Sequence, residues 1–287
     1  MAVLDVRQVS YTYGAGSPFE QQALREVSFQ TVPGELLGII GHTGSGKSTL
    51  IQQLNGLLRP SSGQILLDGQ DIWEKPKEIR QIRFRVGMVF QYPEHQLFEE
   101  TVFNDIAFGP KNMGLSEADM DERVRASAEL VGLAPELLEK SPFDLSGGEK
   151  RRAAIAGVMA MEPDILILDE PTAGLDPRGR EQVFSMIRAY RQRRDTTVLL
   201  VSHSMEDVAR LADRVLVMDH GRVAMLDTAA GVFSRAEELE AMGLTVPAVT
   251  RVMLCLRRAG IPVGTDVYTV EQAQERLLPL LKGGAAL

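Results

Sequence analysis

Cysteine is almost absent from this sequence, which has a single one, Cys255, among 287 residues. One thiol excludes a disulfide within the chain and any metal site built from several cysteines, and it is typical of a reducing compartment. Because Cys255 stands among apolar residues, we expect a buried and unreactive thiol.

Long apolar runs and an excess of basic residues are absent too. No run approaches the roughly 18 apolar residues that a membrane span needs, and the first residues lack the basic and then apolar profile of a signal peptide. The net charge is -8, which argues against broad nucleic-acid binding because such binding requires a basic face. With 44% hydrophobic and 24% charged residues, the chain has the composition of a soluble protein with a sizeable core. If it works at a membrane, we expect other chains to hold it there.

A glycine-containing loop at residues 41–49, with the sequence GHTGSGKST, is the most informative motif. The apolar segment before it, 35–40, predicts a buried strand, and the spaced apolar residues of 50–58 predict a helix that Pro60 ends. Strand, G-x-x-x-x-G-K-[ST] and helix together make the context of a P-loop. Its N–H groups and the positive end of the helix dipole attract phosphate oxygens. We therefore predict a nucleoside triphosphate site at Gly41, His42, Thr43, Gly44, Ser45, Gly46, Lys47, Ser48 and Thr49.

Within this loop, Lys47 is expected to reach the β- and γ-phosphates and the Ser48 hydroxyl to bind Mg²⁺. Further along, the apolar segment 164–168 ends in Asp169 and Glu170. A core strand explains the aliphatic residues but not two carboxylates at its end. Asp169 is the expected Mg²⁺ partner of the P-loop, and Glu170 can polarise a water for attack on the γ-phosphate.

Two other predicted buried strands end on polar residues, Gln91 and His203. Ligands of parallel sheets lie beyond the carboxyl ends of the strands, so Gln91 is placed to touch a nucleotide or its metal. Taken alone, both signals are weak, and a lone histidine at a strand end is more often structural.

Residues 146–149, SGGE, predict a helix N-terminus in which Ser146 is the N-cap and Glu149 completes a capping box. An ordinary capped helix is one interpretation. The other is phosphate binding, because Gly147 and Gly148 leave N–H groups exposed at a helix start. A single domain rarely needs a second phosphate site, but two subunits of a dimer could share them.

The remaining pattern predicts an α/β protein. Residues 2–32 read as antiparallel strands joined at a loop at 14–18, a helical pattern extends from about 92 to 162, and 213–226 predict a last pair of strands. Two amphipathic helices after about 229 need a surface to cover. An aromatic ring near the loop could stack on adenine, and we favour Tyr13 over Tyr11.

These motifs, in this order, resemble the ATP-binding cassette (ABC) family over about residues 3–227. The matching sequences are Walker A (41–49), the Q-loop glutamine (Gln91), the signature sequence (145–149), Walker B with its following glutamate (165–170), the D-loop (173–176) and the switch histidine (His203). The resemblance implies an ABC-type P-loop NTPase with a RecA-like core, an antiparallel β subdomain and an α-helical subdomain at about 92–160. It also implies an ATPase domain at 1–228 and a C-terminal helical extension at 229–287.

In that family ATP is held between two cassettes. The resemblance thus implies that the P-loop of one subunit faces the signature and D-loop residues of the other, namely Ser146, Gly147, Gly148, Glu149 and Asp176. It further implies that Glu170 is the catalytic base and that His203 stabilises the γ-phosphate and the attacking water. Ser48, Gln91 and Asp169 would serve Mg²⁺.

A narrower resemblance, carried by residues 90–102, 41–44 and the extension after 229, points to the ATPases of energy-coupling factor (ECF) transporters, the bacterial importers of vitamins and transition metals. It implies a peripheral subunit on the cytoplasmic face of the cell membrane. The subunit would pair with a second ATPase, alike or different, and work with a transmembrane scaffold and a substrate-binding membrane subunit. His42 resembles the second ATPase of such a pair rather than the first.

Two alternatives differ in class. A soluble ABC ATPase of DNA repair or translation usually has a long coiled-coil insertion or two fused cassettes, and this chain has neither. A switch GTPase or nucleotide kinase would leave residues 146–149 without a purpose, and the guanine-reading N-K-x-D sequence is absent. The transported substrate, a vitamin or a metal ion, is left open by the sequence.

Overall fold

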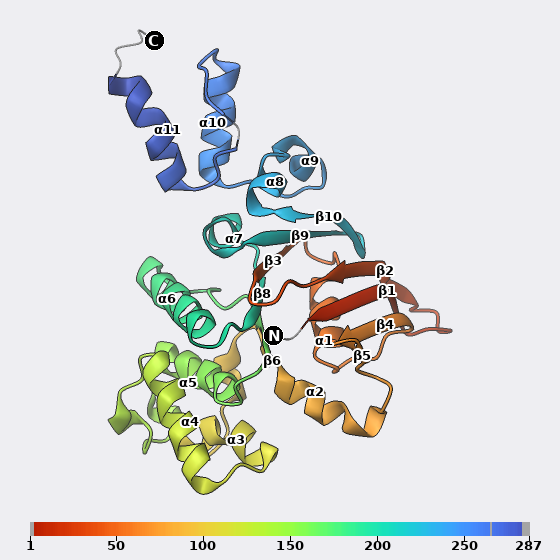
Figure 1. Ribbon diagram of the computed structural model, residues 1–287, viewed down its shortest axis with the longest axis vertical. Helices are drawn as coiled ribbons and strands as arrows, with labels where there is room; N and C mark the ends of the chain where they lie inside the picture. Colours follow the sequence, from red (N-terminus) through yellow and green to blue (C-terminus); the bar gives the residue numbers. More distant parts are fainter. Residues whose placement is uncertain (1–2, 265, 283–287) are drawn as a thin grey trace.

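The computed structural model describes residues 3–264 and 266–282. Two sheets form the centre of the molecule, with one group of helices beyond each end of the larger sheet (Figure 1). The larger sheet has six strands in the order β10-β9-β3-β8-β7-β6, and the smaller has four in the order β2-β1-β4-β5. The strands are β1 (Leu4–Tyr13), β2 (Gln21–Gln30), β3 (Leu36–Ile40), β4 (Ser62–Leu67), β5 (Gln70–Asp71), β6 (Val86–Val89), β7 (Ile165–Asp169), β8 (Thr197–Val201), β9 (Arg214–Asp219) and β10 (Arg222–Thr228).

The larger sheet is parallel except for its edge strand β10. Its inner strands β3 and β8 are buried at every residue, which explains why they read in the sequence as continuous apolar runs rather than alternating ones. The smaller sheet is antiparallel, as predicted, and its long strands β1 and β2 mix buried with exposed residues. Helix α1 (Lys47–Leu54) belongs to a hydrophobic core that includes residues of both sheets.

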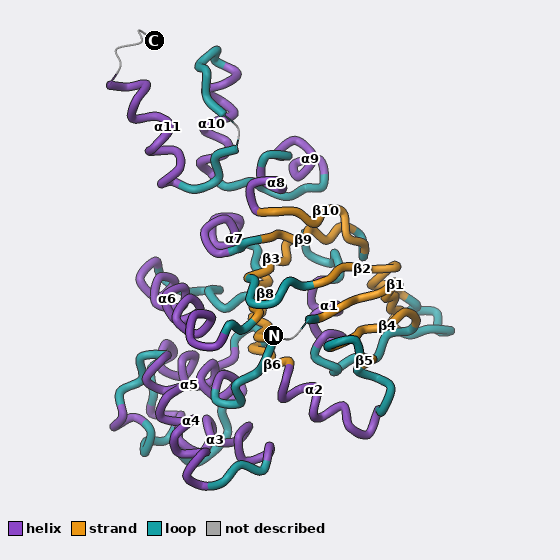
Figure 2. The backbone as a smooth tube through the Cα atoms, viewed as in Figure 1, coloured by secondary structure: helices purple, strands orange, loops and turns teal. Residues whose placement is uncertain are grey.

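A second core joins the other face of the larger sheet to the helices of the middle of the chain (Figure 2). Helix α2 (Ile79–Arg85) packs against the first core. The helices of the second core are α3 (Val102–Met113), α4 (Glu117–Leu130), α5 (Gly147–Met159), α6 (Pro177–Arg194) and, through Leu211, α7 (Met205–Leu211). Of these, α3, α4 and α5 pack on one another and form the helical region that the sequence predicts. The sequence pattern gave no sign of α2.

The C-terminal region has four helices in its described part rather than the two predicted. They are α8 (Ala229–Phe233), α9 (Ala236–Ala241), α10 (Ala248–Arg258) and α11 (Val270–Lys282). The short helices α8 and α9 extend the core beside β9, and α10 and α11 share a small core of their own. Residues 283–287 of the predicted extension lie outside the described residues.

The expectation of a buried thiol is wrong, because Cys255 is exposed. Its helix α10 buries the opposite side, where Met253 is fully enclosed.

The predicted helix at 50–58 is also too long, since α1 ends at Leu54. The Asn55 side chain donates a hydrogen bond to the Val86 carbonyl, and Gly56 then adopts a φ of 72°, a left-handed conformation that ends helices.

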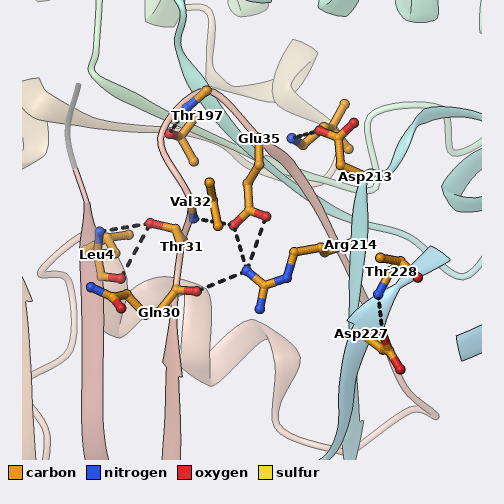
Figure 3. A network of polar contacts seen from close by, with 12 residues as sticks. Leu4, Gln30, Thr31, Val32, Glu35, Thr197, Asp213, Arg214, Asp227 and Thr228 are labelled. Atoms are coloured by element: carbon orange, nitrogen blue, oxygen red, sulfur yellow. Dashed lines mark hydrogen bonds and ion pairs between the residues drawn. The ribbon is translucent and has the colours of Figure 1, made fainter. Parts of the chain in front are cut away.

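The entrance to β3 is fixed by a polar network that joins the two sheets (Figure 3). Arg214 donates to the Gln30 carbonyl at 3.3 Å and to the Glu35 carboxylate at 3.4 and 3.5 Å. Glu35 also accepts from the Val32 N–H at 2.7 Å. Burial raises the pKa of Glu35 despite the opposing effects of these partners. The network holds the start of the strand whose other end carries the phosphate loop.

Phe184 of α6 gives a test of the second core, because only 1% of its surface is exposed. Replacing it with alanine should lower the free energy of unfolding by about 3–5 kcal/mol, since the lost burial adds to the cost of a cavity. Urea unfolding followed by circular dichroism measures this. Phe19 is the matched control, as it is 88% exposed and its alanine variant should change stability by less than about 0.5 kcal/mol. Equal losses in the two variants would contradict the assignment of this core.

Candidate active site

A cavity of about 690 Å³ lies where the β3, β7 and β8 strands end, and it collects most of the predicted site residues. Its lining includes the phosphate-loop residues Thr43, Gly44, Gly46, Lys47, Ser48 and Thr49, together with Tyr13, Gln91, Asp169, Glu170 and His203. These residues come from five separate parts of the chain. Gln91, which the sequence places beyond the carboxyl end of a strand, thus lines the same cavity as the phosphate loop.

Gly46 shows why the loop needs glycine. Its φ is 100°, and a Cβ there would lie 2.7 Å from the Ala23 carbonyl oxygen. The residue is also the N-cap of α1, so the loop turns directly into a helix whose first N–H groups are free to bind an anion.

The Lys47 side chain folds back onto the phosphate loop that carries it. Its Nζ donates to the carbonyl oxygens of Gly41 at 2.6 Å and His42 at 3.1 Å. Burial lowers the pKa of Lys47, while the charges of Glu170 and Asp169 oppose that shift. A lysine ammonium has three protons, so two bonds to the loop leave one for a ligand in the cavity.

Two carboxylates face this lysine from the end of β7. Burial raises the pKa of Asp169, with Lys47 opposing. Burial and the neighbouring Asp169 raise the pKa of Glu170 to about 7, although the hydrogen bond from the His203 backbone amide and the charge of Lys47 act to lower it. Glu170 also has a φ of 50°, a conformation that costs energy outside glycine and recurs at functional sites.

Within the described chain, Glu170 Oε1 is buried without a hydrogen-bond partner. The nearest imidazole is that of His203, whose Nε2 lies 3.4 Å away. Burial lowers the pKa of His203, and Lys47 lowers it further, so its ring is neutral at neutral pH. A neutral imidazole and an unpartnered carboxylate oxygen at one point can together orient a water molecule.

The two tyrosines are distinguished by position. Tyr13 lines the cavity, and its hydroxyl lies 3.2 Å from Thr49 Oγ1. Tyr11 does not line the cavity and packs edge-on against Tyr13, with ring centroids 4.8 Å apart. The sequence preference for Tyr13 as the aromatic residue of the site agrees with this arrangement.

The predicted capping box is confirmed: Ser146 caps α5, Glu149 N–H donates to its hydroxyl, and Glu149 Oε2 accepts from the Ser146 backbone at 2.8 Å. These residues do not lie in the phosphate-loop cavity. Gly148 and Asp176 instead line a separate hollow. A single chain therefore does not bring the two predicted phosphate sites together.

Three residues of the phosphate loop lie outside the cavity lining, namely Gly41, His42 and Ser45. The His42 side chain faces the end of β9 instead. The cavity also has lining residues that the sequence did not point to, which are Glu20, Gln21, Gln22, Ala23, Arg25, Val201, His220 and Gly221. They lie on β2 or directly before it, at the end of β8 and in the β9–β10 turn, and no local motif marks them.

An ion pair that the sequence did not reveal connects three of the motifs. Arg151 of α5 binds Glu94 through two hydrogen bonds of 2.7 and 3.0 Å and donates to the Ala173 carbonyl at 2.7 Å. Glu94 follows Gln91, Arg151 follows the 146–149 sequence and Ala173 precedes Asp176. Only 7% and 17% of the Arg151 and Glu94 side chains are exposed, so the contact fixes these segments relative to one another.

Replacing Glu94 with glutamine should lower the free energy of unfolding at neutral pH by about 2–3 kcal/mol, because Arg151 loses its charged acceptor. Burial raises the pKa of Glu94, but the Arg151 hydrogen bonds and charge outweigh it and the net pKa lies below the ordinary 4.5. A lowered pKa gives stability that is present above the unfolded pKa and is lost as the pH falls. Urea titrations should thus show the gap between wild type and variant narrowing below about pH 4.5. A gap that is independent of pH would contradict the ion pair.

Known proteins are similar to this chain in sequence. The ABC transporter family model matches residues 24–173. The chain is 53% identical to the energy-coupling factor transporter ATP-binding protein EcfA2 of Caldanaerobacter subterraneus subsp. tengcongensis over 280 residues, 98% of each chain. It is 54% identical to EcfA2 of Symbiobacterium thermophilum over 275 residues, 96% of this chain and 95% of the relative.

Solved structures of ABC cassettes are similar to this chain in fold. CbiO1 of Clostridium perfringens, described as part of the ABC transporter complex CbiONQ, has a TM-score of 0.74 and 38% identity over 90% of this chain and 96% of its own. The dimeric ABC transporter cassette MJ0796 has a TM-score of 0.71 and 27% identity over 79% of this chain and 98% of its own. The expected ABC-type P-loop NTPase fold is confirmed. This chain is an ATP-binding ABC ATPase and belongs to the energy-coupling factor transporter ATP-binding proteins.

Proposed function

We propose that this chain hydrolyses ATP as a motor subunit of an ECF importer for a vitamin or a transition metal ion. The observation that carries the proposal is the meeting of Lys47, Asp169, Glu170 and His203 in one cavity. Closure of two such subunits on ATP would drive the membrane partners, and hydrolysis would reset them.

Each residue has a distinct role in this proposal. The phosphate-loop N–H groups and Lys47 hold the β- and γ-phosphates, while Tyr13 stacks on the adenine. The Glu170 carboxylate accepts the proton of the attacking water, and the neutral His203 ring orients that water and the γ-phosphate. The proximity of Glu170 Oε1 to His203 Nε2, 3.4 Å, supports this pairing.

The donor set of the cavity fits Mg²⁺. It offers the Ser48 hydroxyl, the Gln91 amide oxygen and the Asp169 carboxylate, all of them hard oxygen ligands that Mg²⁺ prefers. When bound, the ion would neutralise charge on the phosphates. Lys47 and the loop amides would then position the γ-phosphate for the water at Glu170.

A second ATPase subunit, identical or related, would complete the site. Ser146, Gly147, Gly148, Glu149 and Asp176 lie outside the cavity of their own chain, and exposed N–H groups at the start of α5 can bind the phosphates of a neighbour. The dimeric form of the related cassette MJ0796 supports this assembly.

The membrane partners have a candidate contact surface. No helix in the described residues has the length and apolar character needed to cross a bilayer. A mainly apolar groove near Gln91 is lined by Phe84, Phe98 and Phe108, and the last two are 60% and 46% exposed. We propose that this groove receives a segment of the transmembrane scaffold, which holds the subunit on the cytoplasmic face of the membrane.

We assign residues 1–228 to the ATPase domain and 229–287 to a helical extension that adds to the contact between ATPases.

Co-expression with membrane subunits of an ECF transporter and a second ATPase, detergent extraction and affinity purification test this function. We expect the chain to copurify with a second ATPase and membrane subunits, and Phe98→Asp to abolish capture of the membrane subunits without changing ATP affinity. Phe19→Asp, at another exposed phenylalanine away from the groove, is the control. A chain that hydrolyses ATP but never copurifies with membrane subunits would favour the soluble ABC ATPase instead.

A further inference from the structure

Two histidines and a carboxylate converge beside the phosphate loop. His42 Nε2 lies 3.0 Å from Asp219 Oδ1, and His220 Nε2 lies 3.8 Å from the same oxygen. One ligand atom from each residue falls within 4.8 Å of the others. His42 follows β3, and the other two belong to the end of β9 and its turn, so neighbouring strands of the larger sheet bring them together (Figure 1).

The proton on His42 can be placed. Its Nδ1 lies 2.8 Å from the Thr43 carbonyl oxygen, which can only accept, so Nδ1 carries a hydrogen. The Nε2 of a neutral ring then has a lone pair directed at the Asp219 carboxylate. The lone pairs of His42 Nε2 and Asp219 Oδ1, two atoms 3.0 Å apart, repel each other. A cation that both atoms bind removes the repulsion.

The ion-pair partners of Asp219 among the described residues are His42 and His220, so no lysine or arginine supplies that cation. The histidine pair itself is close, with ring centroids 5.0 Å apart. The side chains are open to solvent, since 29% of His42, 29% of Asp219 and 80% of His220 are exposed.

We propose that His42, Asp219 and His220 bind a divalent transition metal ion of the Zn²⁺, Ni²⁺ or Co²⁺ class. Imidazole nitrogens favour these ions over Mg²⁺ and Ca²⁺, which require oxygen. A tetrahedral ion with bonds of about 2.0–2.1 Å separates its ligand atoms by about 3.4 Å, and the distances of 3.0 and 3.8 Å lie on either side of that value. Metal-binding histidines usually donate their other ring N–H to a carbonyl or carboxylate, as His42 Nδ1 does to the Thr43 carbonyl.

The position of the site connects it to nucleotide binding. The Gly221 N–H, in the same turn as His220, donates to the Ser45 carbonyl at 3.1 Å. The His42 carbonyl accepts from Lys47 Nζ. A metal ion bound here would cross-link the phosphate loop to the β9–β10 turn and so reduce the freedom of the loop that holds Lys47.

This proposal does not rest on a role in transport, and its test uses neither ATP nor membrane partners. The full chain, with any purification tag removed and metals stripped with EDTA, is titrated with ZnCl₂ by calorimetry. We expect one Zn²⁺ per chain and a rise in melting temperature with Zn²⁺. His220→Asn should weaken binding at least about tenfold. Its turn should remain intact, because His220 and Gly221 both have positive φ and asparagine suits that conformation.

Asp219→Asn should weaken Zn²⁺ binding at least about tenfold as well. His203→Ala and His95→Ala are controls that should keep it, since neither residue belongs to the cluster. Loss of binding in His203→Ala alone would place the ion at the Glu170 side and overturn the proposal. Absence of Zn²⁺ binding in the wild type would also overturn it, leaving a protonated His42 paired with Asp219.

Discussion

Replacing Glu170 with glutamine should reduce the turnover of ATP at least about 100-fold, which is the lower range for loss of a general base, while ATP affinity stays close to that of the wild type. Glutamine is nearly the same size as glutamate and can occupy the same place at this backbone conformation, but its amide cannot accept a proton. The carboxylate is suited to that task because it is buried, unpartnered at Oε1 among the described residues and has a pKa raised to about 7. Phosphate release at saturating Mg-ATP measures turnover, and equilibrium binding of a fluorescent ATP analogue measures affinity.

The variant should also accumulate as an ATP-bound dimer, because closure precedes the step that it blocks. Light scattering with and without ATP would detect this. Glu181→Gln is the matched control, since Glu181 lies on the exposed face of α6 and pairs with Arg210. Near-normal turnover in the Glu170 variant would remove this residue as the base, and equal losses in both variants would point to a change in folding rather than chemistry.

The parts of the site that could be read from the sequence are those set by local rules. The phosphate loop, the capping box at Ser146 and the strand ending in Asp169 and Glu170 each depend on residues within a few positions of one another. Parallel strands then place Gln91, Glu170 and His203 at one edge without further information. The family resemblance added the prediction, which no local rule makes, that the Ser146 segment serves a second subunit.

The features that the sequence did not show depend on distant contacts. Arg151 and Glu94 are 57 positions apart, and nothing near either residue indicates its partner. The exposure of Cys255 was missed because a sequence does not say which side of a helix finds a surface. Helices α8 and α9 have five and six residues, too few for a periodic pattern, and tertiary packing rather than propensity stabilises such short helices.

Replacing Lys47 with alanine should raise the dissociation constant for Mg-ATP at least about tenfold, since a hydrogen bond to a charged group is worth about 1.5–3 kcal/mol. The turnover of ATP should also fall. The Lys47 side chain is enclosed by its own loop and faces Asp169 and Glu170, so its loss removes the positive charge nearest to where the γ-phosphate must lie. Binding of a fluorescent ATP analogue measures the effect, and circular dichroism verifies the fold. Lys111→Ala, on an exposed position of α3, should bind ATP like the wild type.

The two active-site variants together separate binding from chemistry. If Lys47 acts on the phosphates and Glu170 on the water, the lysine variant loses affinity and turnover, whereas the glutamate variant loses turnover alone. Unchanged ATP affinity in Lys47→Ala would mean that the loop amides and Mg²⁺ hold the triphosphate without this lysine. In that case the hydrogen bonds from Lys47 to the Gly41 and His42 carbonyls would make it a support for the shape of the loop rather than a ligand of the nucleotide.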